Sequence, residues 1–225
     1  MCSEACVEFI RKNLREDEVR GKAVIEVGSL DVNGSVRPAV EALRPASYIG
    51  IDLREGPGVD IVCNAESLLE RFGPEVFDIL ITTELLEHVR DWRLIISNLK
   101  KLLKPNGLLL ITTRSKGFPF HGYPFDFWRY EVSDMRVIFS DFVVEMIEPD
   151  SLDPGVFVKV RKPSKFAECD LTNYSLYSII RAKRVNHINE LDIYFCLLRI
   201  KYKIRGLLSS ILPASVKKLL RMLGA

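Results

Sequence analysis

The stretch AVIEVGSLDVNG, residues 23–34, decides the fold. Its first five residues are mostly apolar, as in a short buried strand, and Gly28 follows directly. A glycine at a strand end lets the backbone approach a ligand closely. A helix is predicted from Gly34 to about Leu43, because Pro45 follows its end. The stretch therefore predicts a strand, a ligand-binding turn and a helix in direct succession.

The same alternation continues to about residue 160. An amphipathic helix is predicted at 3–16, further strands at 48–52, 59–63, 77–83 and 108–113, and further helices at 65–72, 92–103 and 132–140. Strands that alternate with helices indicate a parallel sheet covered on both faces. Two last strand-like runs, 142–147 and 156–160, are joined by eight residues. A parallel crossover needs about a dozen residues or more, so these runs should pair antiparallel at one edge of the sheet.

The composition changes after about residue 163, and we divide the chain into a domain at 1–162 and a basic helical extension at 163–225. Helices are predicted at 173–205 and 214–223. Residues 199–225 hold seven basic residues and no acidic one, whereas the rest has 25 basic and 30 acidic residues. This tail suits an anionic membrane surface, or it packs against the core or a partner chain. Nucleic acid is disfavoured, because no stacking platform is interleaved with the basic residues.

Cysteines and histidines give no metal or disulfide pattern. The five cysteines are irregularly spaced and include no CxxC pair. No two of His88, His121 and His187 have metal-ligand spacing, so no metal site is expected. The chain begins without a signal-peptide pattern, and no apolar run approaches the roughly 18 residues of a membrane span. We expect a cytoplasmic protein, with membrane contact confined to the inner face through the tail. No pattern indicates an oligomeric state.

Two acidic residues indicate the kind of ligand. Asp52 ends the second predicted strand, 24 residues after Gly28, where a carboxylate can accept hydrogen bonds from ribose hydroxyls. The dinucleotide fingerprint G-x-G-x-x-G is absent, since Ser29 and Leu30 follow Gly28. Glu26 would repel a pyrophosphate but would attract a cationic group. These features disfavour a nicotinamide cofactor and favour S-adenosylmethionine, which has an ammonium and a sulfonium but no phosphate.

Five segments together carry a resemblance to a known family. They are IEVGSLDVNGSVR (25–37), YIGIDL (48–53), DIVCNAESL (60–68), FDILITTELLEHVRDW (77–92) and LLKPNGLLLITT (102–113). In this order and spacing the chain resembles class I S-adenosylmethionine-dependent methyltransferases of the type 11 group. The resemblance implies a Rossmann-like α/β fold with a seven-stranded, mostly parallel sheet whose last strand is antiparallel.

The resemblance also implies a cofactor site. Glu26 and Gly28 would lie by the methionyl part, Asp52 at the ribose, and Asn64 and Ala65 at the adenine. The residues predicted to contact S-adenosylmethionine, or its product S-adenosylhomocysteine, are Glu26, Gly28, Ser29, Asp52, Leu53, Asn64, Ala65, Thr83 and Glu84. Asn64 stands where family members often have an acid, and an amide can still hydrogen-bond the adenine amino group.

A loop rich in aromatic residues is the best candidate for the acceptor site. The segment FPFHGYPFDFWRY, 118–130, holds seven of the 21 aromatic residues and follows the fifth strand, so it should overhang the site. His121 is the candidate general base, with Asp126 orienting it. Candidate substrate contacts are His88, Phe120, Tyr123, Trp128 and Arg129. Alternatively, Trp128, Arg129 and Tyr130 pack this loop onto the next helix, and His88 has a packing role.

These observations predict a methyltransferase that acts on a small molecule or a glycan, and a sugar hydroxyl is the acceptor we favour. Methyl transfer depends largely on positioning, so a conspicuous catalytic triad is not expected. One alternative is a non-catalytic S-adenosylmethionine-binding or scaffold protein, associated with a membrane surface or a protein partner.

Overall fold

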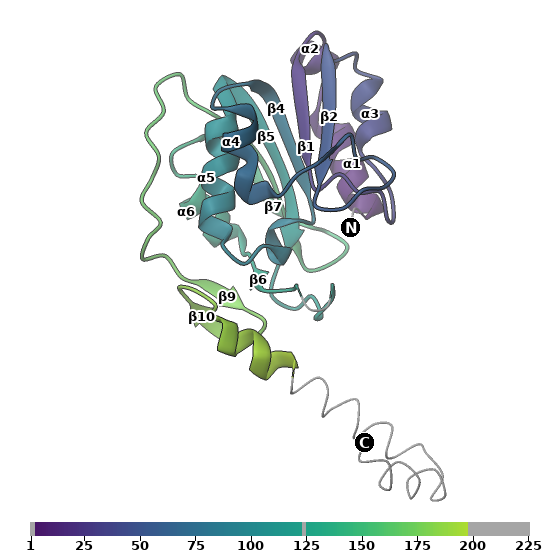
Figure 1. Ribbon diagram of the computed structural model, residues 1–225. Coiled ribbons are helices and arrows are strands. Elements are labelled where there is room, and N and C mark those ends of the chain that lie inside the picture. The colour runs from purple at the N-terminus through teal and green to yellow at the C-terminus, as the bar shows by residue number, and fades with distance from the viewer. Residues whose placement is uncertain (1–2, 123–124, 198–225) are drawn as a thin grey trace, which may run out of the picture. The chain divides into compact units, whose positions relative to one another are not determined.

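The computed structural model describes residues 3–122 and 125–197 (Figure 1). Contacts divide the chain into a body, Met1–His187, and a C-terminal unit, Ile188–Ala225. In the described part of the body, the main sheet has the order β3 (Ile61–Val62), β2 (Ser47–Asp52), β1 (Ala23–Val27), β4 (Phe77–Thr83), β5 (Leu103–Arg114), β8 (Gly155–Arg161) and β7 (Val143–Pro149). The pairs from β3 to β5 are parallel, and β8 is antiparallel to both of its neighbours. The predicted edge hairpin and the predicted fold class are confirmed.

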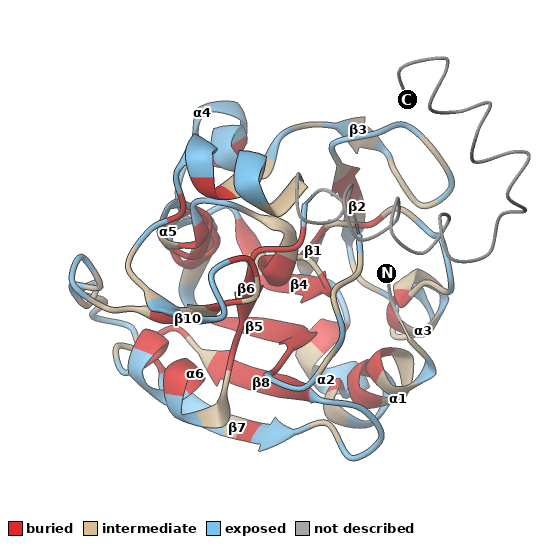
Figure 2. Cartoon of the chain, turned by 90° about the horizontal axis from the view of Figure 1, so that it is seen from below, coloured by how far each residue is buried: buried red, intermediate tan, exposed pale blue. Residues whose placement is uncertain are grey.

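Helices cover both faces of this sheet. On one side lie α1 (Glu4–Asn13), α2 (Glu16–Val19) and α3 (Arg37–Glu41), and on the other lie α4 (Leu68–Phe72), α5 (Trp92–Leu102) and α6 (Val132–Ile138) (Figure 1). The Oγ of Ser3 accepts from Cys6 N at the start of α1. Phe9 of α1 stacks on Phe157 of β8, with ring centroids 4.8 Å apart. Figure 2 shows the central strands as the most buried part of the molecule, which makes them a rigid base for the loops at their ends.

The structure differs from the prediction at 173–187, which is not helical. Two short strands lie here, β9 (Leu176–Ser178) and β10 (Lys183–Val185). β9 pairs with both β10 and β6 (Trp128–Arg129), which gives a second sheet of order β10-β9-β6. The helical prediction was wrong here because the pairing partner lies about fifty residues away in the chain, beyond the reach of local periodicity.

The body therefore extends past residue 162, where we expected its end. Arg93 of α5 donates hydrogen bonds to the carbonyls of Leu171, Tyr174 and Asn186. This one side chain ties the segment after β8 to the body, and the boundary between the two units falls after His187.

The described part of the C-terminal unit is short. Residues 190–197 are helical, and Asn189 and Asp192 hydrogen-bond reciprocally at the start of this helix. The predicted basic tail at 199–225 and the helix at 214–223 lie outside the described residues. None of the helices that the structure describes has the length and apolar character needed to cross a membrane.

A buried ion pair fastens α5 to the segment after α6. Lys100 is fully buried, and its Nζ lies 2.7 Å from Asp141, which also accepts from Cys169 N at 3.0 Å. The neighbouring Lys101 forms a pair with Glu168 at 3.2 Å, but its side chain is 46% exposed.

We expect Lys100→Met to lower the free energy of unfolding by about 3 kcal/mol, because it leaves a buried carboxylate without its partner. Lys101→Met is the matched control on the same helix and should change it by less than about 1 kcal/mol. Urea denaturation followed by circular dichroism measures both values. Equal effects of the two substitutions would contradict this account.

Candidate functional site

The site is built where the strand order reverses, between β1 and β4. Ligands of open α/β sheets bind beyond the carboxyl ends of the strands at such a point. Gly28 directly follows β1 with φ +87°, a conformation that favours glycine. A Cβ on Gly28 would lie 3.3 Å from the side chain of Leu85, which follows β4. The turn after β1 thus passes close to the end of β4.

Asp52 lies beside this turn. Its Oδ2 accepts from Leu30 N at 3.3 Å, and its Oδ1 accepts from Arg54 N at 3.1 Å. Two backbone donors therefore hold the carboxylate at the end of β2. Ser29 is buried, and its Oγ makes no hydrogen bond to any residue that the structure describes. An unsatisfied buried hydroxyl next to a left-handed glycine is suited to a polar ligand.

Glu26 is buried on β1, with 2% of its surface exposed. The hydroxyl of Tyr48 donates to it, and the Arg37 guanidinium lies 4.5 Å from the centre of the Tyr48 ring. Burial raises the pKa of Glu26 to about 7, although Tyr48 and Arg37 act against this. Its carboxyl group can therefore change charge near neutral pH in response to a neighbouring cation.

The predicted adenine-side residues follow β2 and β3. Leu53, a large apolar side chain, is 67% exposed. It lies at the edge of the sheet formed by the carboxyl ends of the parallel strands, which we call the carboxyl edge. Asn64 caps the 3-10 helix Ala65–Ser67, with its Oδ1 accepting from Glu66 N at 3.0 Å. Asn98 of α5 donates to Ala65 O at 3.0 Å. Asn64 and Ala65 are thus held in place from two sides.

Two of the predicted cofactor contacts lie at the end of β4: Thr83 is its last residue and Glu84 follows it. Thr83 is buried, and Glu84 has the strained φ of +54°. Glu84 forms an ion pair with Arg114 of β5 and accepts from Cys6 Sγ at 3.6 Å. Burial raises the pKa of Glu84 to about 9, with Arg114 opposing the shift. The Glu84 side chain is thus occupied by its contact with Arg114 in the protein interior.

The aromatic loop contains the predicted His121–Asp126 pair. His121 Nδ1 lies 3.0 Å from Asp126 Oδ2, and Asp126 is fully buried. Arg129 donates to both carboxylate oxygens of Asp126, at 2.6 and 2.8 Å. Although burial lowers it, the pKa of His121 is raised to about 9 by Asp126 and by Glu87. A protonated imidazole cannot accept a proton, so this arrangement does not favour His121 as a general base.

The other aromatic-loop residues have different surroundings. Trp128 and Arg129 are both almost fully buried. Trp128 Nε1 donates to Arg90 O at 3.1 Å, and Arg129 donates to Phe118 O and Pro119 O. Both side chains support the loop, and the structure does not place them on a surface that a substrate reaches. Phe120 is half-buried, and Tyr123 lies outside the described residues.

The structure brings His88 next to His121, with ring centroids 4.7 Å apart. The fully buried Glu87 faces both rings, with its Oε1 3.9 Å from His88 Nε2 and 3.7 Å from His121 Nε2, while its Oε2 accepts from Thr113 Oγ1 at 2.8 Å. Glu87 is the functional candidate that sequence reasoning missed. Its signal was present in the ELLEH stretch, residues 84–88, from which we selected only Glu84 and His88.

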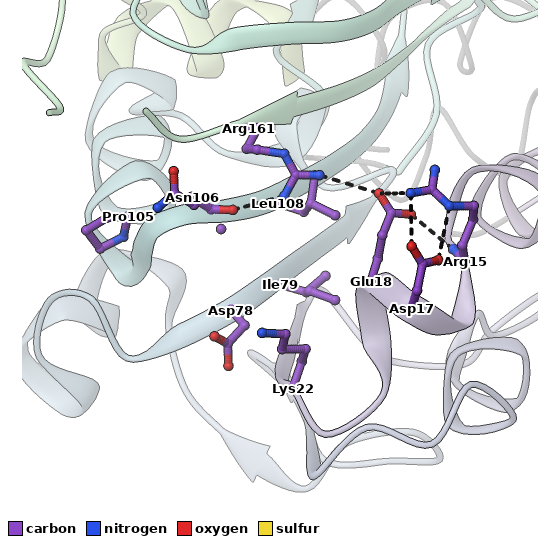
Figure 3. A pocket seen from close by; sticks show the side chains of 11 residues that line it. Arg15, Asp17, Glu18, Lys22, Asp78, Ile79, Pro105, Asn106, Leu108 and Arg161 are labelled. Carbon is purple, nitrogen blue, oxygen red and sulfur yellow. Dashed lines mark hydrogen bonds and ion pairs between the residues drawn. The ribbon is translucent and has the colours of Figure 1, made fainter. Parts of the chain in front are cut away.

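A cavity of about 520 Å³ lies at the other end of the sheet (Figure 3). It is lined by charged side chains that include Arg15, Glu18, Lys22 and Asp78. Several of them are paired with one another, as Arg161 is with Glu18 at 3.4 Å. Because it opens at the amino ends of β4 and β5, this cavity is not the cofactor site.

Comparison with known proteins identifies the family of the chain. Residues 4–145 match the model of a methyltransferase domain family, which is more than half of the chain. The chain belongs to this family. S-adenosylmethionine is the cofactor that the family implies, and the Gly28 turn, the Ser29 hydroxyl and the Asp52 carboxylate fit its polar groups.

Individual relatives are more distant. A ubiquinone biosynthesis O-methyltransferase of Pseudomonas putida (strain W619) is 34% identical over 107 residues, covering 41% of this chain and 44% of the relative. The chain thus spans less than half the length of that relative. An S-adenosylmethionine-dependent methyltransferase from Mesorhizobium loti superposes with a TM-score of 0.53 at 17% identity, over 71% of this chain and 99% of that one.

A second solved structure is the 1,6-didemethyltoxoflavin-N1-methyltransferase of Burkholderia thailandensis, with bound 1,6-didemethyltoxoflavin and S-adenosylhomocysteine. It has a TM-score of 0.53 and 15% identity, over 64% of this chain and 72% of that one. At these identities the solved structures support the fold alone.

Glu26 should make stability depend on pH. In the folded protein the pKa of Glu26 is about 7, above the 4.5 of an unperturbed glutamate, so its favourable contribution to stability is complete below pH 4.5 and is lost as pH rises through 7. We expect the wild type to lose on the order of 3 kcal/mol relative to Glu26→Gln between pH 5 and about pH 8. Urea denaturation at both pH values measures this, with Glu41→Gln on α3 as the exposed control. Parallel pH profiles of wild type and Glu26→Gln would refute it.

Proposed function

We propose that this chain is an S-adenosylmethionine-dependent methyltransferase that methylates a hydroxyl of a small molecule or glycan. Family membership supports the activity, and the relatives named O-methyltransferase support oxygen as the acceptor atom. The observation that carries the proposal is the Gly28 turn, which lies against both Asp52 and the end of β4.

Different residues at the carboxyl edge would bind different parts of the cofactor. Asp52, oriented by Leu30 N and Arg54 N, would accept from the ribose hydroxyls. Gly28 and Ser29 would line the methionyl part, where Glu26 favours a positive charge. The other predicted contacts are Leu53, Asn64 and Ala65 at the adenine, and Thr83 and Glu84 after β4. When bound, the cofactor supplies an electrophilic methyl group whose thioether leaving group needs no proton.

The acceptor would bind beneath the aromatic loop. Phe118 and Phe120 are half-buried and Phe125 is 60% exposed, so the loop offers apolar rings to a ligand. Such rings can stack on the apolar face of a sugar or on a flat ring system. This supports a sugar hydroxyl as the acceptor, with Phe120 and His88 among its contacts.

The basic tail adds a further candidate partner. Its charge alone supports contact with an anionic membrane surface at the inner face, and lipid-linked acceptors are therefore included in the acceptor panel below.

We expect Asp52→Ala to weaken S-adenosylmethionine binding about 10- to 100-fold, because charged hydrogen bonds of about 1.5–3 kcal/mol are lost. Calorimetric titration measures this, with Asp170→Ala as the control, because Asp170 is an exposed acid that is not among the predicted cofactor contacts. Absence of binding to the wild type would disprove the proposed cofactor.

We also expect S-adenosylhomocysteine to accumulate only when a suitable acceptor is present. The panel contains free saccharides, lipid-linked saccharides and other hydroxylated small molecules, and mass spectrometry identifies the methylated product. Methylation of another small molecule while all saccharides fail would exclude the sugar acceptor. Tight cofactor binding without turnover on any acceptor would favour the scaffold alternative.

A further inference from the structure

We propose that Glu87, His88 and His121 form a binding site for a divalent transition-metal ion. One ligand atom from each residue can be chosen so that all three atoms lie within 4.8 Å of one another. Glu87 Oε1 lies 3.7 Å from His121 Nε2 and 3.9 Å from His88 Nε2. The Nε2 atoms of two imidazoles thus converge on one carboxylate oxygen.

Both imidazoles are oriented through their other nitrogen. His88 Nδ1 lies 2.5 Å from Phe125 O, and His121 Nδ1 lies 3.0 Å from Asp126 Oδ2. An imidazole that donates its Nδ1–H to a carbonyl or carboxylate can bind a metal through Nε2, provided that the ion displaces any proton on that nitrogen. This is the arrangement found around protein-bound metals, where such partners fix the tautomer and the ring orientation.

The surroundings of Glu87 are a second, independent observation that indicates a ligand. Its side chain is fully buried, and Oε1 has no hydrogen-bond partner among the residues that the structure describes. Distances of 3.7 and 3.9 Å to the two imidazoles are too long for hydrogen bonds. Oε1 thus has two imidazoles within ion-pair distance but no hydrogen bond, and a metal ion bound between it and the two Nε2 atoms would give this buried oxygen a direct contact.

To hold an ion, the three ligand atoms must move closer together, including the two imidazole nitrogens, which the present geometry keeps within 4.8 Å of each other. Bonds of about 2.1 Å in a tetrahedral site put ligand atoms about 3.4 Å apart, so each carboxylate–imidazole distance must shorten by roughly half an ångström or less. Two nitrogens and one oxygen suit zinc, manganese, iron or cobalt better than calcium or magnesium, which take oxygen ligands. Three protein ligands also leave a coordination position open, as in catalytic rather than structural sites.

The loop backbone permits the approach of the two histidines. Gly122 has φ +66°, and a Cβ built on it would lie 2.6 Å from His88 Cε1. Any other residue at 122 would push this ring away. Gly122 therefore allows the aromatic loop to bring His121 against His88.

The position of the proposed metal site suggests what a bound ion would do in methyl transfer. This step alone rests on the proposed function. Glu87 and His88 follow β4 through the 3-10 helix Leu86–His88, and His121 follows β5. The open coordination position would lie between the carboxyl edge and the aromatic loop, where it could hold the acceptor hydroxyl. His121 would then act as a metal ligand in place of the general base that the sequence suggested.

The test is metal binding by the full chain, without S-adenosylmethionine, after treatment with a chelator. Zn²⁺ is titrated by calorimetry, and Co²⁺ is titrated with its visible absorption as a report of the ligand set. We expect one equivalent to bind to the wild type and to His187→Ala, which removes the remaining, exposed histidine. Glu87→Gln, His88→Ala and His121→Ala should each weaken binding at least tenfold.

Gly122→Ala provides a further variant in which all three ligands remain. It should weaken metal binding by displacing His88. Thermal melts with and without Zn²⁺ show whether each variant is folded and whether the ion stabilises it. Binding that survives Glu87→Gln and His121→Ala, or a Co²⁺ spectrum dominated by thiolate, would overturn the proposal. So would a wild type that binds no ion at micromolar concentration. Neither result bears on the cofactor titration, so the two proposals fail independently.

Discussion

The amides of Gly28 and Ser29 both donate to the carbonyl of Ile51, at 2.8 and 3.0 Å, and this shared acceptor ties the turn after β1 to the end of β2. Val27 is the last residue of β1 in register with β2, opposite Ile51. The chain must leave the sheet at this point, and the positive φ of Gly28 provides the change of direction. The placement of Leu30 against Asp52, and of the turn against Leu85, follows from it.

Buried acidic side chains determine the arrangement of the part of the site beneath the aromatic loop. A buried carboxylate is tolerated only when it is paired or hydrogen-bonded, so each acid beneath the aromatic loop constrains the groups around it. Asp126 is paired with Arg129 and His121, and Glu84 with Arg114. Glu87 differs in its charge partners, since its Oε1 faces the Nε2 atoms of two imidazoles while its Oε2 accepts from Thr113. The convergence of two imidazoles on one buried carboxylate oxygen distinguishes the Glu87 region from the other buried acids named above.

The local elements were largely predictable from the sequence. The alternation of strands and helices, the edge hairpin and the helix at 92–103 all correspond to observed elements. β5 begins at Leu103 rather than at 108, because Leu103 pairs with Phe77 although Pro105, Asn106 and Gly107 interrupt the apolar pattern. The strands β9 and β10 were missed since strands of three residues carry too little periodicity, and β6, the second partner of β9, lies in the aromatic loop.

The sequence by itself determined the sheet type, the turn at Gly28 after β1 and the position of Asp52 at the end of β2. These features are local: apolar runs, a glycine at a strand end and an acid at the next strand end are readable within a few residues. Only the tertiary structure decided that His88 and His121, 33 residues apart, converge on Glu87, and that Arg129 binds Asp126 inside the protein. Such contacts depend on how a loop packs and which charges it must satisfy on burial. Neither the packing of the loop nor the pairing of its buried charges can be inferred from the spacing of residues along the chain.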